Sequence, residues 1–359
     1  MAAELLRAFL RCTFFTATPT GMARCAGLKA IRMHRYGGPE VLQLEEVDTP
    51  RCGPNDVRIS VHATSVNPVD FKIREGMQRA VVWISFPFIP GMDVSGVISE
   101  VGVKVTAWKV GDEVFASPSH LRQGTYAEEV VVRASEVAHK PKNLSHVEAA
   151  SLPLVAMTAW YSLVKSAKLK SGQRVLIQAG AGGVGTAAIQ LAKALGASEV
   201  FATCSTRNVE LVRSLGATPI DYTKDDYRVV ARGVDVVLDS LGGEHLVAAL
   251  KLVKRFGHVS CITPSFPTFA RKYGVAGGFF VFLLHAAWLT VSSLIRKQVT
   301  LAFVTRFAVG TVLHQLGQLA EQGKLKPVVD RTYPLSEVAE AHRYAETGRA
   351  RGKIVLTVR

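Results

Sequence analysis

Short apolar runs alternate with helix-like segments through the middle of the chain. Residues 174–179 (RVLIQA) have the length and composition of a buried strand, and apolar residues then recur every three or four positions until Gly196, where a helix is expected to end. Further strand-like runs follow at 199–204, 234–239 and 257–264. Residues 155–270 are therefore expected to alternate strands and helices around an open parallel sheet.

The region ahead of this unit has a different pattern. Residues 41–140 contain short Val-rich runs separated by turn sequences such as 51–55 (RCGPN) and 109–112 (KVGD), which is typical of a β-rich unit. The sequence shows no internal repeat, low-complexity segment or Pro/Ser-rich linker. We therefore expect two closely joined units.

A glycine-rich loop joins the first strand of the α/β unit to its first helix. Glycine lets the backbone turn tightly and approach a phosphate, and the helix that follows offers free N–H groups to the negative charge. This context is typical of a dinucleotide site, although a glycine-rich turn without a ligand would share it. The candidate residues are Gly180, Ala181, Gly182, Gly183, Val184 and Gly185.

The end of the next strand indicates which dinucleotide the site prefers. Sites for NAD usually place Asp or Glu there to bind the ribose hydroxyls, whereas this chain has Ser205, Thr206 and Arg207. Small hydroxyls and a guanidinium suit the 2′-phosphate of NADPH, so we predict Ser205 and Arg207 as its ligands. The alternative is that Arg207 is a solvated residue at a helix start.

Other candidates follow from the position of the strand ends. In an open parallel sheet, ligands lie beyond the carboxyl ends of the strands, although any residue there could equally be an ordinary loop residue. The candidates are Tyr222, Leu241, Gly242 and Ile262.

The charge balance narrows the partners. The 359 residues include 43 Lys and Arg against 29 Asp and Glu, a formal net charge of +14. The basic residues are spread along the chain without a helix-turn-helix or an aromatic–basic RNA motif, so we favour attraction of an anionic cofactor or membrane over a nucleic-acid partner. The five Cys include no Cys-x-x-Cys pair, which argues against a disulfide framework or a four-cysteine zinc site.

The first residues differ from the rest of the chain. Up to residue 26, Arg7, Arg11 and Arg24 oppose a single acid, Glu4, and apolar residues gather on one side of a helix. An Arg-bearing, acid-poor amphipathic start is typical of a mitochondrial presequence, which we predict over residues 1–28. A disordered basic tail is the alternative.

One long apolar stretch also needs an explanation. Residues 273–295 contain no charged residue and lie between Arg271-Lys272 and Arg296-Lys297. The stretch is long enough to span a bilayer, but a span would divide the fold. We therefore expect a helix against the core or a subunit interface, or peripheral contact with a membrane or a lipophilic substrate.

Further motifs flank the glycine loop in a fixed order. They lie at 65–76 (SVNPVDFKIREG), 90–97 (PGMDVSGV), 109–114 (KVGDEV), 123–129 (QGTYAEE), 149–153 (AASLP), 157–160 (MTAW) and 350–355 (ARGKIV). From about residue 29 to the end, this set resembles the zinc-free quinone oxidoreductase branch of the medium-chain dehydrogenase/reductase superfamily. Within it, the set is most similar to the mitochondrial reticulon-interacting oxidoreductases.

The resemblance implies an α/β fold in which a Rossmann domain is inserted into a β-rich, GroES-like catalytic domain. The implied divisions are 29–151 and 306–359 for the two parts of the catalytic domain and 152–305 for the NADPH-binding Rossmann domain. It also implies a homodimer, because relatives are often dimers.

The resemblance further implies roles for individual residues. Asn67 would lie near the nicotinamide and donate a hydrogen bond to a developing oxyanion. Lys72, which is close to it in the sequence, is a candidate to stabilise an enolate or to deliver a proton. Their alternatives are an Asn67 that only caps a turn and a surface pair of Asp70 with Lys72. Zinc-dependent relatives place a Cys at the position of Asn67 and a His-Glu pair at Met92-Asp93, so no metal is expected.

Three more residues are implied as cofactor ligands. Thr158 would hold the carboxamide, while Arg351 and Lys353 would clamp phosphate from a C-terminal loop that folds back in relatives. Surface charge is the alternative for Arg351 and Lys353.

These observations converge on a reaction class. Without a metal, oxidising an unactivated alcohol is difficult, whereas an electron-poor quinone or α,β-unsaturated carbonyl accepts hydride from a nicotinamide more easily. We predict an NADPH-dependent oxidoreductase of the mitochondrial matrix, which the resemblance links to ubiquinone biosynthesis. The alternative is an NADPH-holding scaffold at a mitochondrial membrane with little turnover.

Overall fold

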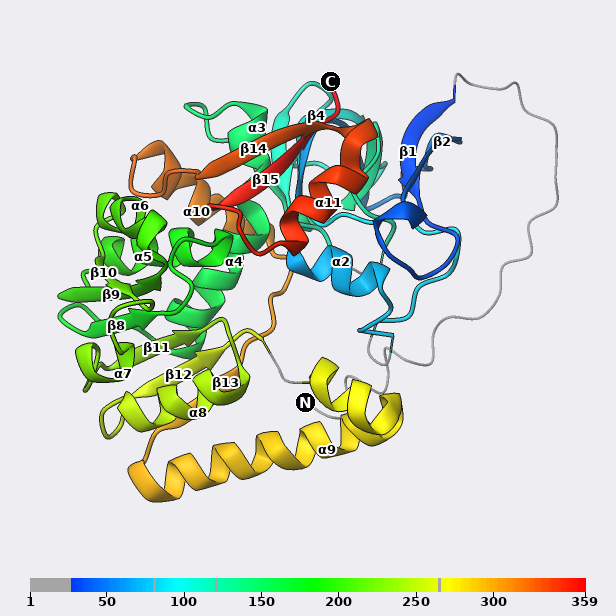
Figure 1. Cartoon of the computed structure of the whole chain (residues 1–359). Helices are drawn as coiled ribbons and strands as arrows, with labels where there is room; N and C mark the ends of the chain where they lie inside the picture. Colours follow the sequence, from blue (N-terminus) through cyan, green and yellow to red (C-terminus); the bar gives the residue numbers. More distant parts are fainter. Residues whose placement is uncertain (1–26, 80–81, 120–121, 264–265) are drawn as a thin grey trace.

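The computed structural model describes residues 27–79, 82–119, 122–263 and 266–359. In these residues the chain forms two units side by side, each built on its own sheet (Figure 1). The predicted presequence lies outside the described residues, apart from its last two positions.

The first unit is a seven-stranded sheet with strand order β14-β15-β3-β4-β5-β7 and with β6 also paired to β3. Along β3 the side chains alternate between buried and half-exposed positions, the period-two pattern of a sheet with one face on a core. The last two strands come from the end of the chain and complete this sheet, with β15 antiparallel to β3. The strands are β3 (Asp56–Val66), β4 (Val94–Val101), β5 (Glu113–Ala116), β6 (Glu129–Arg133), β7 (Val137–His139), β14 (Val329–Pro334) and β15 (Lys353–Thr357).

A separate hairpin stands beside this sheet. It pairs β1 (Leu28–Arg32) with β2 (Gln43–Val47) in antiparallel register. The 3₁₀ turn η1 (Pro39–Val41) lies between the two strands.

The second unit is a six-stranded, all-parallel sheet with strand order β10-β9-β8-β11-β12-β13. All four residues of β11 are buried, as expected where helices cover both faces of a parallel sheet. The strands are β8 (Arg174–Ile177), β9 (Glu199–Cys204), β10 (Thr218–Asp221), β11 (Val236–Asp239), β12 (His258–Cys261) and β13 (Thr300–Phe303).

Helices cover the two faces of the parallel sheet with separate apolar cores. One core joins the sheet to α4, α5 and α10, and the other joins it to α8 and to part of α9. The helices of the chain are α2 (Pro68–Arg74), α3 (His146–Ala150), α4 (Pro153–Trp160), α5 (Gly183–Ala194), α6 (Val209–Ser214), α7 (Tyr227–Val230), α8 (Gly243–Leu252), α9 (Phe266–Lys297), α10 (Gly310–Glu321) and α11 (Val338–Glu346). The shorter turns are η2 (Ala134–Glu136), η3 (Tyr161–Ser166, a π-helix continuing α4), η4 (Thr206–Asn208) and η5 (Leu335–Glu337).

This architecture confirms the predicted fold class, a Rossmann-type parallel sheet inserted into a GroES-like β-rich unit. The chain leaves the first sheet after β7 and returns to it at β14. The predicted domain boundaries at 151 and 305 fall in the connections between the two sheets. The boundaries themselves stay a prediction.

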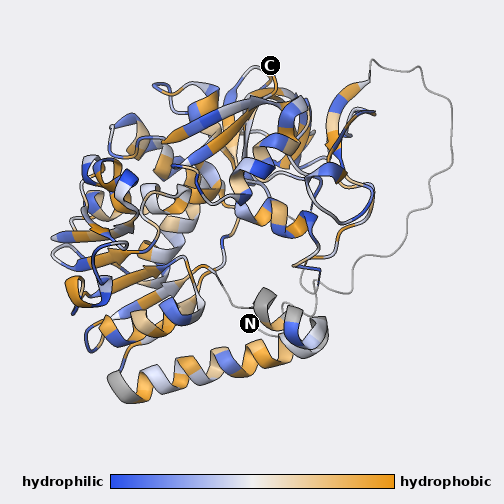
Figure 2. Cartoon of the chain, viewed as in Figure 1, coloured by the Kyte–Doolittle hydropathy of each residue, from blue (hydrophilic) through white to orange (hydrophobic). Residues whose placement is uncertain are grey.

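The apolar stretch at 273–295 belongs to α9, which runs along the lower side of the parallel sheet in Figure 1 and is largely apolar in Figure 2. The helix breaks at Gly274, whose φ of 71° is not helical. Residues 277–295 are long and apolar enough to cross a membrane by length and composition, and 11% of the stretch is buried. The expectation that α9 packs into the core therefore holds for only one of its faces.

Candidate functional site

The glycine loop lies between β8 and α5, as predicted. A Cβ added at Gly185 would clash with the carbonyl oxygen of Ala179, so this glycine is required for the loop to pack on itself. At Gly182, the N-cap of α5, an added Cβ would meet only the Ala179 oxygen at 3.4 Å. Gly182 therefore leaves room in front of the free N–H groups of α5, where an anionic phosphate group would be favoured.

The C-terminal motif lies directly against this loop. The Gly352 N–H donates to the Ala181 carbonyl over 2.8 Å, and Gly182 and Gly352 form an isolated parallel bridge. The structure therefore places Arg351, which precedes β15, and Lys353, the first residue of β15, beside the glycine loop. Their roles as cofactor ligands stay a prediction.

The Lys353 side chain crosses the loop and ends in the GroES-like unit. Its Cδ lies 2.8 Å from the position of a Cβ added at Gly183. Its ammonium donates to the Val66 carbonyl at 2.8 Å and to Asn67 Oδ1 at 2.6 Å, and lies 3.6 Å from Asp93 Oδ2. Burial lowers the pKa of Lys353, while Asp93 and Asp70 oppose that shift. A contact between this ammonium and phosphate would require it to leave these partners, and the surface-charge alternative does not fit its burial.

Asn67 and Asp93 form the centre of this buried cluster. The Asn67 amide nitrogen donates to Asp93 Oδ2 at 2.8 Å and to the Ser65 carbonyl at 3.3 Å, so both amide hydrogens are engaged. Asp93 also accepts from the Ser65 hydroxyl at 2.7 Å and from the Leu154 N–H at 2.8 Å, near the start of α4. In this arrangement Asn67 holds Asp93 in place, and its predicted role as an oxyanion donor would require one of these bonds to open.

Asp70 extends the cluster away from the glycine loop. Its Oδ2 accepts the Asn67 backbone N–H at 2.8 Å and the Tyr126 hydroxyl at 3.0 Å, while its buried Oδ1 has no partner among the described residues. The pKa of Asp70 is raised to about 7, and burial of the carboxyl is the largest cause of this shift. Tyr126 in turn contacts His342, which lies 3.0 Å from Arg74.

These contacts decide between the alternatives for Lys72. A surface pair of Asp70 with Lys72 is wrong, because Asp70 is 1% exposed and its carboxyl faces Tyr126 and the turn of α2. Among the described residues, the Lys72 ammonium has no hydrogen-bond or ion-pair partner. Burial lowers the pKa of this half-buried amine, which favours proton transfer nearer neutrality. Its role as proton donor stays a prediction.

Arginines gather beyond the carboxyl end of β9. The Arg207 guanidinium donates to the Arg349 carbonyl at 2.6 Å, and the Arg351 guanidinium donates to the Arg207 carbonyl at 3.2 Å. All three residues are exposed. Ser205 lies at the same point, where its hydroxyl accepts from Asn208 at 3.2 Å. Sequence reasoning missed Arg349, which comes from the turn after α11 and has no motif of its own.

The other predicted cofactor residues lie at the expected strand ends. Tyr222 and Leu241 follow β10 and β11 and are 60% and 45% exposed, although both are apolar. Asp239 accepts the N–H groups of Leu241 and Gly242 and so fixes that loop, while Ile262 follows β12 and is half-buried. Apolar side chains left open at this edge fit the faces of a bound dinucleotide.

Two polar side chains at this edge can form further hydrogen bonds. Gln178, which directly follows β8, is fully buried with neither amide atom partnered among the described residues, and no sequence pattern pointed to it. Thr158, in α4, donates to the Leu154 carbonyl at 2.7 Å and keeps lone pairs that can accept from a carboxamide. Open room at Gly182, unpartnered Gln178 and exposed apolar strand ends together fit a nicotinamide dinucleotide.

A bound metal ion would need several ligand side chains close together. The described residues contain no group of three or more His, Cys, Asp or Glu side chains placed to hold a metal ion. At the position where relatives bind zinc, Asn67 and Asp93 are hydrogen-bonded to the chain, and the cationic Lys353 lies beside them.

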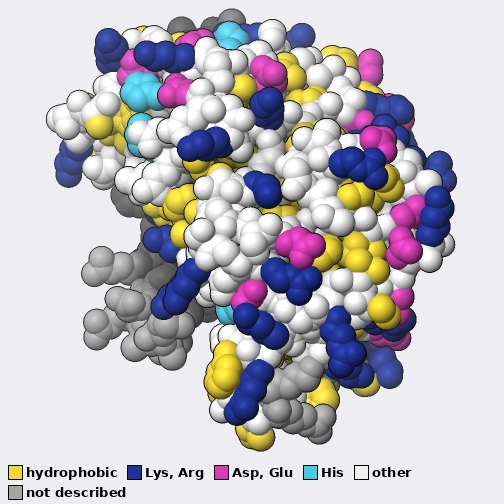
Figure 3. Space-filling view, turned by 90° about the vertical axis from the view of Figure 1, so that its left-hand side faces the viewer, with side chains coloured by type: hydrophobic (Ala, Val, Ile, Leu, Met, Phe, Trp, Pro, Cys, Tyr) yellow, Lys and Arg dark blue, Asp and Glu magenta, His cyan; other side chains and the backbone are white. Residues whose placement is uncertain are grey.

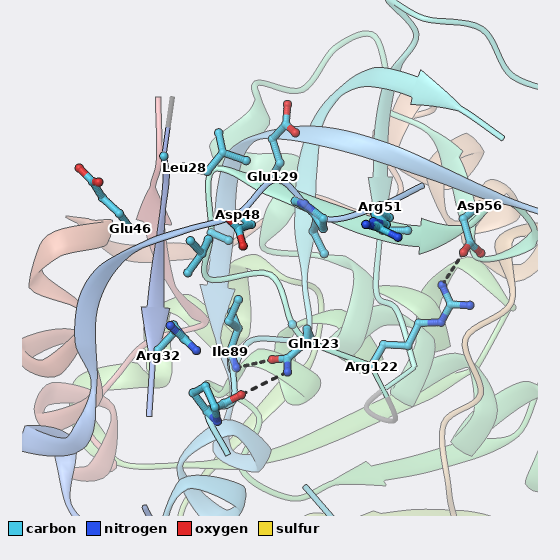
Figure 4. A pocket seen from close by; sticks show the side chains of 18 residues that line it. Leu28, Arg32, Glu46, Asp48, Arg51, Asp56, Ile89, Arg122, Gln123 and Glu129 are labelled. Atoms are coloured by element: carbon cyan, nitrogen blue, oxygen red, sulfur yellow. Dashed lines mark hydrogen bonds and ion pairs between the residues drawn. The ribbon is translucent and has the colours of Figure 1, made fainter. Parts of the chain in front are cut away.

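The large cavity of the first unit is separate from this site. It encloses about 940 Å³ beneath the β1–β2 hairpin (Figure 4) and is lined by both basic and acidic residues. Within it Arg122 pairs with Asp56 at 3.1 Å, and Gln123 binds the Ile89 N–H. None of the predicted site residues lines it. On the outer face of the parallel-sheet unit, Lys and Arg side chains are scattered among acidic ones (Figure 3).

Two family models match the chain. One is described as a zinc-binding dehydrogenase and covers residues 215–356, and the other as the GroES-like domain of alcohol dehydrogenases, over residues 53–142. The mouse (Mus musculus) protein named mitochondrial NAD(P)H oxidoreductase RTN4IP1 is 39% identical over 373 residues, covering 96% of this chain and 92% of the relative.

Two further relatives extend the comparison. The Arabidopsis thaliana protein named chloroplastic NADPH-dependent alkenal/one oxidoreductase is 37% identical over 92% of this chain and 79% of its own. The solved structure of a quinone oxidoreductase from Coxiella burnetii superposes with a TM-score of 0.80 and 33% identity, covering 92% of this chain and 99% of that one.

Proposed function

The chain belongs to the medium-chain dehydrogenase/reductase superfamily and is an NAD(P)H-dependent oxidoreductase, and from this premise we propose that it is an NADPH-specific, zinc-independent reductase of quinones or α,β-unsaturated carbonyl compounds. The acceptor class rests on relatives that are named for quinones and for alkenals and enones.

The preference for NADPH rests on the arginines beyond β9. Arg207, Arg349 and Arg351 are exposed and linked by hydrogen bonds, and the planar guanidinium of each matches the oxygens of a phosphate. A 2′-phosphate adds charge that such a group binds through charge-assisted hydrogen bonds. This grouping is the single observation that carries the cofactor preference.

The residues of the chain would bind and orient the reactants. The nicotinamide supplies the hydride when it is bound. Gly182 and the start of α5 would receive the pyrophosphate, and Thr158 would accept from the carboxamide. Lys353 places a buried positive charge beside Asn67, where it would favour negative charge developing on an acceptor oxygen. Lys72 would then supply a proton.

The donor set supports the proposed zinc independence. An Asn amide is a poor zinc ligand, and Asp93 already accepts from Ser65, Asn67 and Leu154. The ammonium of Lys353 would repel a divalent cation at the same place. The residues at this position therefore do not fit zinc.

We extend the proposal to the cellular setting. Curated relatives are named mitochondrial, and the chain begins with an Arg-bearing, acid-poor segment. We propose a matrix protein that acts on a lipophilic acceptor of the ubiquinone pathway, as a homodimer.

The test is NADPH and NADH oxidation by the purified protein over a panel of quinones and enones. We expect turnover with NADPH, and we expect Arg207→Glu to raise KM for NADPH by about tenfold or more while sparing NADH. The matched control is Arg213→Glu, which changes another exposed arginine, one that pairs with Glu210 on α6. Equal effects of Arg207→Glu on both cofactors would contradict the assignment.

Two further results would decide between the alternatives. Activity should survive dialysis against a chelator, and one retained zinc ion per chain would refute zinc independence. Tight NADPH binding with no turnover on any acceptor would favour the scaffold instead of the reductase.

A further inference from the structure

The second part of α9 turns a continuous apolar face outward. Phe280, Leu284, Trp288, Val291 and Ile295 are between 54% and 75% exposed, and they recur every three or four residues along one side of the helix. Exposed Phe279, Leu283 and Leu294 adjoin them. An apolar surface of this extent on a protein marks an interaction site.

The opposite face of the helix carries its contacts with the protein. The Phe282 ring lies 5.8 Å from that of Phe303 on β13, and Leu289 is buried in the sheet core. Ser293 is 8% exposed and donates to the carbonyls of Thr290 and Val299. A surface helix in water has its polar side outward, whereas the outward side of this helix is apolar.

Both ends of α9 are tied to the same sheet. β12 ends at Cys261 before the helix begins at Phe266, and β13 begins at Thr300 after the helix ends at Lys297. β12 and β13 are adjacent, parallel strands. A helix tied in this way cannot place its ends on opposite sides of a bilayer, so a membrane could meet only its outer face.

A further exposed aromatic residue, outside α9, lies near the C-terminal end of the helix. Phe256, in the loop before β12, is 71% exposed, and the Arg255 guanidinium lies 4.9 Å from its ring centre. Arg255 also donates to Gln298 at 2.9 Å, which joins this loop to the end of α9. Aromatic and cationic side chains at the rim of an apolar surface are typical of a membrane interface.

We propose that α9, with Phe256, docks the protein in the plane of an anionic phospholipid bilayer. The sequence places Arg271-Lys272 before the apolar stretch and Arg296-Lys297 after it, and the whole chain carries +14. At this surface the flanking charges attract anionic headgroups and disfavour a second copy packed on the same face. The proposal concerns only this surface and does not depend on the redox reaction.

The test is cosedimentation of the full chain with vesicles of phosphatidylcholine, alone or mixed with phosphatidylglycerol. We expect binding that is stronger to the anionic vesicles and that salt weakens. Phe280→Glu and Leu284→Glu should each lower the partition coefficient by about tenfold or more, because each removes an apolar side chain from the bilayer. The matched control is Val103→Glu, which changes an equally apolar side chain that is 91% exposed and lies after β4.

Three results would overturn the proposal. The first is absence of wild-type binding to either vesicle. The second is unchanged binding of both α9 variants while their NADPH binding and circular dichroism match the wild type. The third is retention in the membrane after alkaline carbonate, which would indicate a membrane-spanning helix. If sedimentation velocity shows that Leu284→Glu dissociates a dimer while vesicles bind neither form, the face is an interface between copies instead.

Brominated lipids provide a second readout. Quenching of tryptophan emission should fall in Trp288→Phe and persist in Trp108→Phe, because Trp108 packs against the core of the GroES-like sheet and donates to the Ala134 carbonyl. Quenching that Trp288→Phe leaves unchanged would contradict docking through α9.

Discussion

Replacing Asp70 by Asn should remove a pH dependence from the stability of the folded chain. The Asp70 carboxyl is 1% exposed, accepts from Asn67 and Tyr126 through one oxygen, and has no partner among the described residues for the other. Burial raises its pKa from 3.8 to about 7. An Asn side chain has the same shape and can accept the same two hydrogen bonds, but it does not titrate.

The sign follows from proton binding in the two states. Between pH 4 and pH 7 the folded chain keeps a proton on Asp70 that the unfolded chain has lost, so the stability from this group is complete below pH 4 and declines as the pH rises through about 7. Each pKa unit corresponds to about 1.4 kcal/mol. From pH 5 to pH 8 the wild type should therefore lose about 2 to 3 kcal/mol relative to Asp70→Asn.

The assay is denaturant unfolding of both proteins at pH 5, 6, 7 and 8. The stability of the variant relative to the wild type should rise steadily from pH 5 to pH 7 and change little from there to pH 8. Titration of His342 does not change the difference in stability between the two proteins, because burial lowers its pKa to about 3 and both proteins contain it. Stability differences that stay constant across this pH range would refute the burial and protonation of Asp70 argued above.

The remaining predictions concern the cofactor loop and the charge beside it. Lys353→Met should cost about 3 to 5 kcal/mol in calorimetry, because it leaves the fully buried Asp93 without its cation; a change below about 0.5 kcal/mol would show that the pair is not buried. Gly185→Ala should prevent stable folding, because its Cβ would clash with the Ala179 oxygen. Gly182→Ala should fold with an unchanged melting temperature, because its Cβ would enter only the open side of the loop. The same variant should bind NADPH about tenfold or more weakly in calorimetric titration. Equal behaviour of the two glycine variants would contradict the separate roles given to Gly185 and Gly182.

Local pattern was enough to predict the parallel sheet and its ligand edge. Strand-like runs at 174–179, 199–204 and 234–239 became β8, β9 and β11, because buried strands of a parallel sheet are apolar on both faces and helices separate them. The glycine loop was placed correctly for the same reason, since both of its flanks carry a periodic signal.

The buried polar cluster could not be predicted in this way. Asp70, Tyr126 and His342 are joined by hydrogen bonds across 56 and 216 positions of the sequence. Such contacts depend on the pairing of distant strands, and the residues carry no local periodicity. A short sequence separation even suggested the wrong partner, a surface pair of Asp70 with Lys72.

Lys353 shows why direction is harder to predict than position. The resemblance placed it near the cofactor loop, and the structure does so through the Gly182–Gly352 bridge. Its four-carbon stem then passes over Gly183, where any Cβ would lie 2.8 Å from its Cδ, and delivers the charge to Asn67. Gly183 therefore does more than shape the turn between β8 and α5. It leaves room for the side chain of Lys353, a residue of the GroES-like sheet, to pass over the glycine loop of the parallel-sheet unit and to place its positive charge beside the carboxylate of Asp93, where we propose that the acceptor binds.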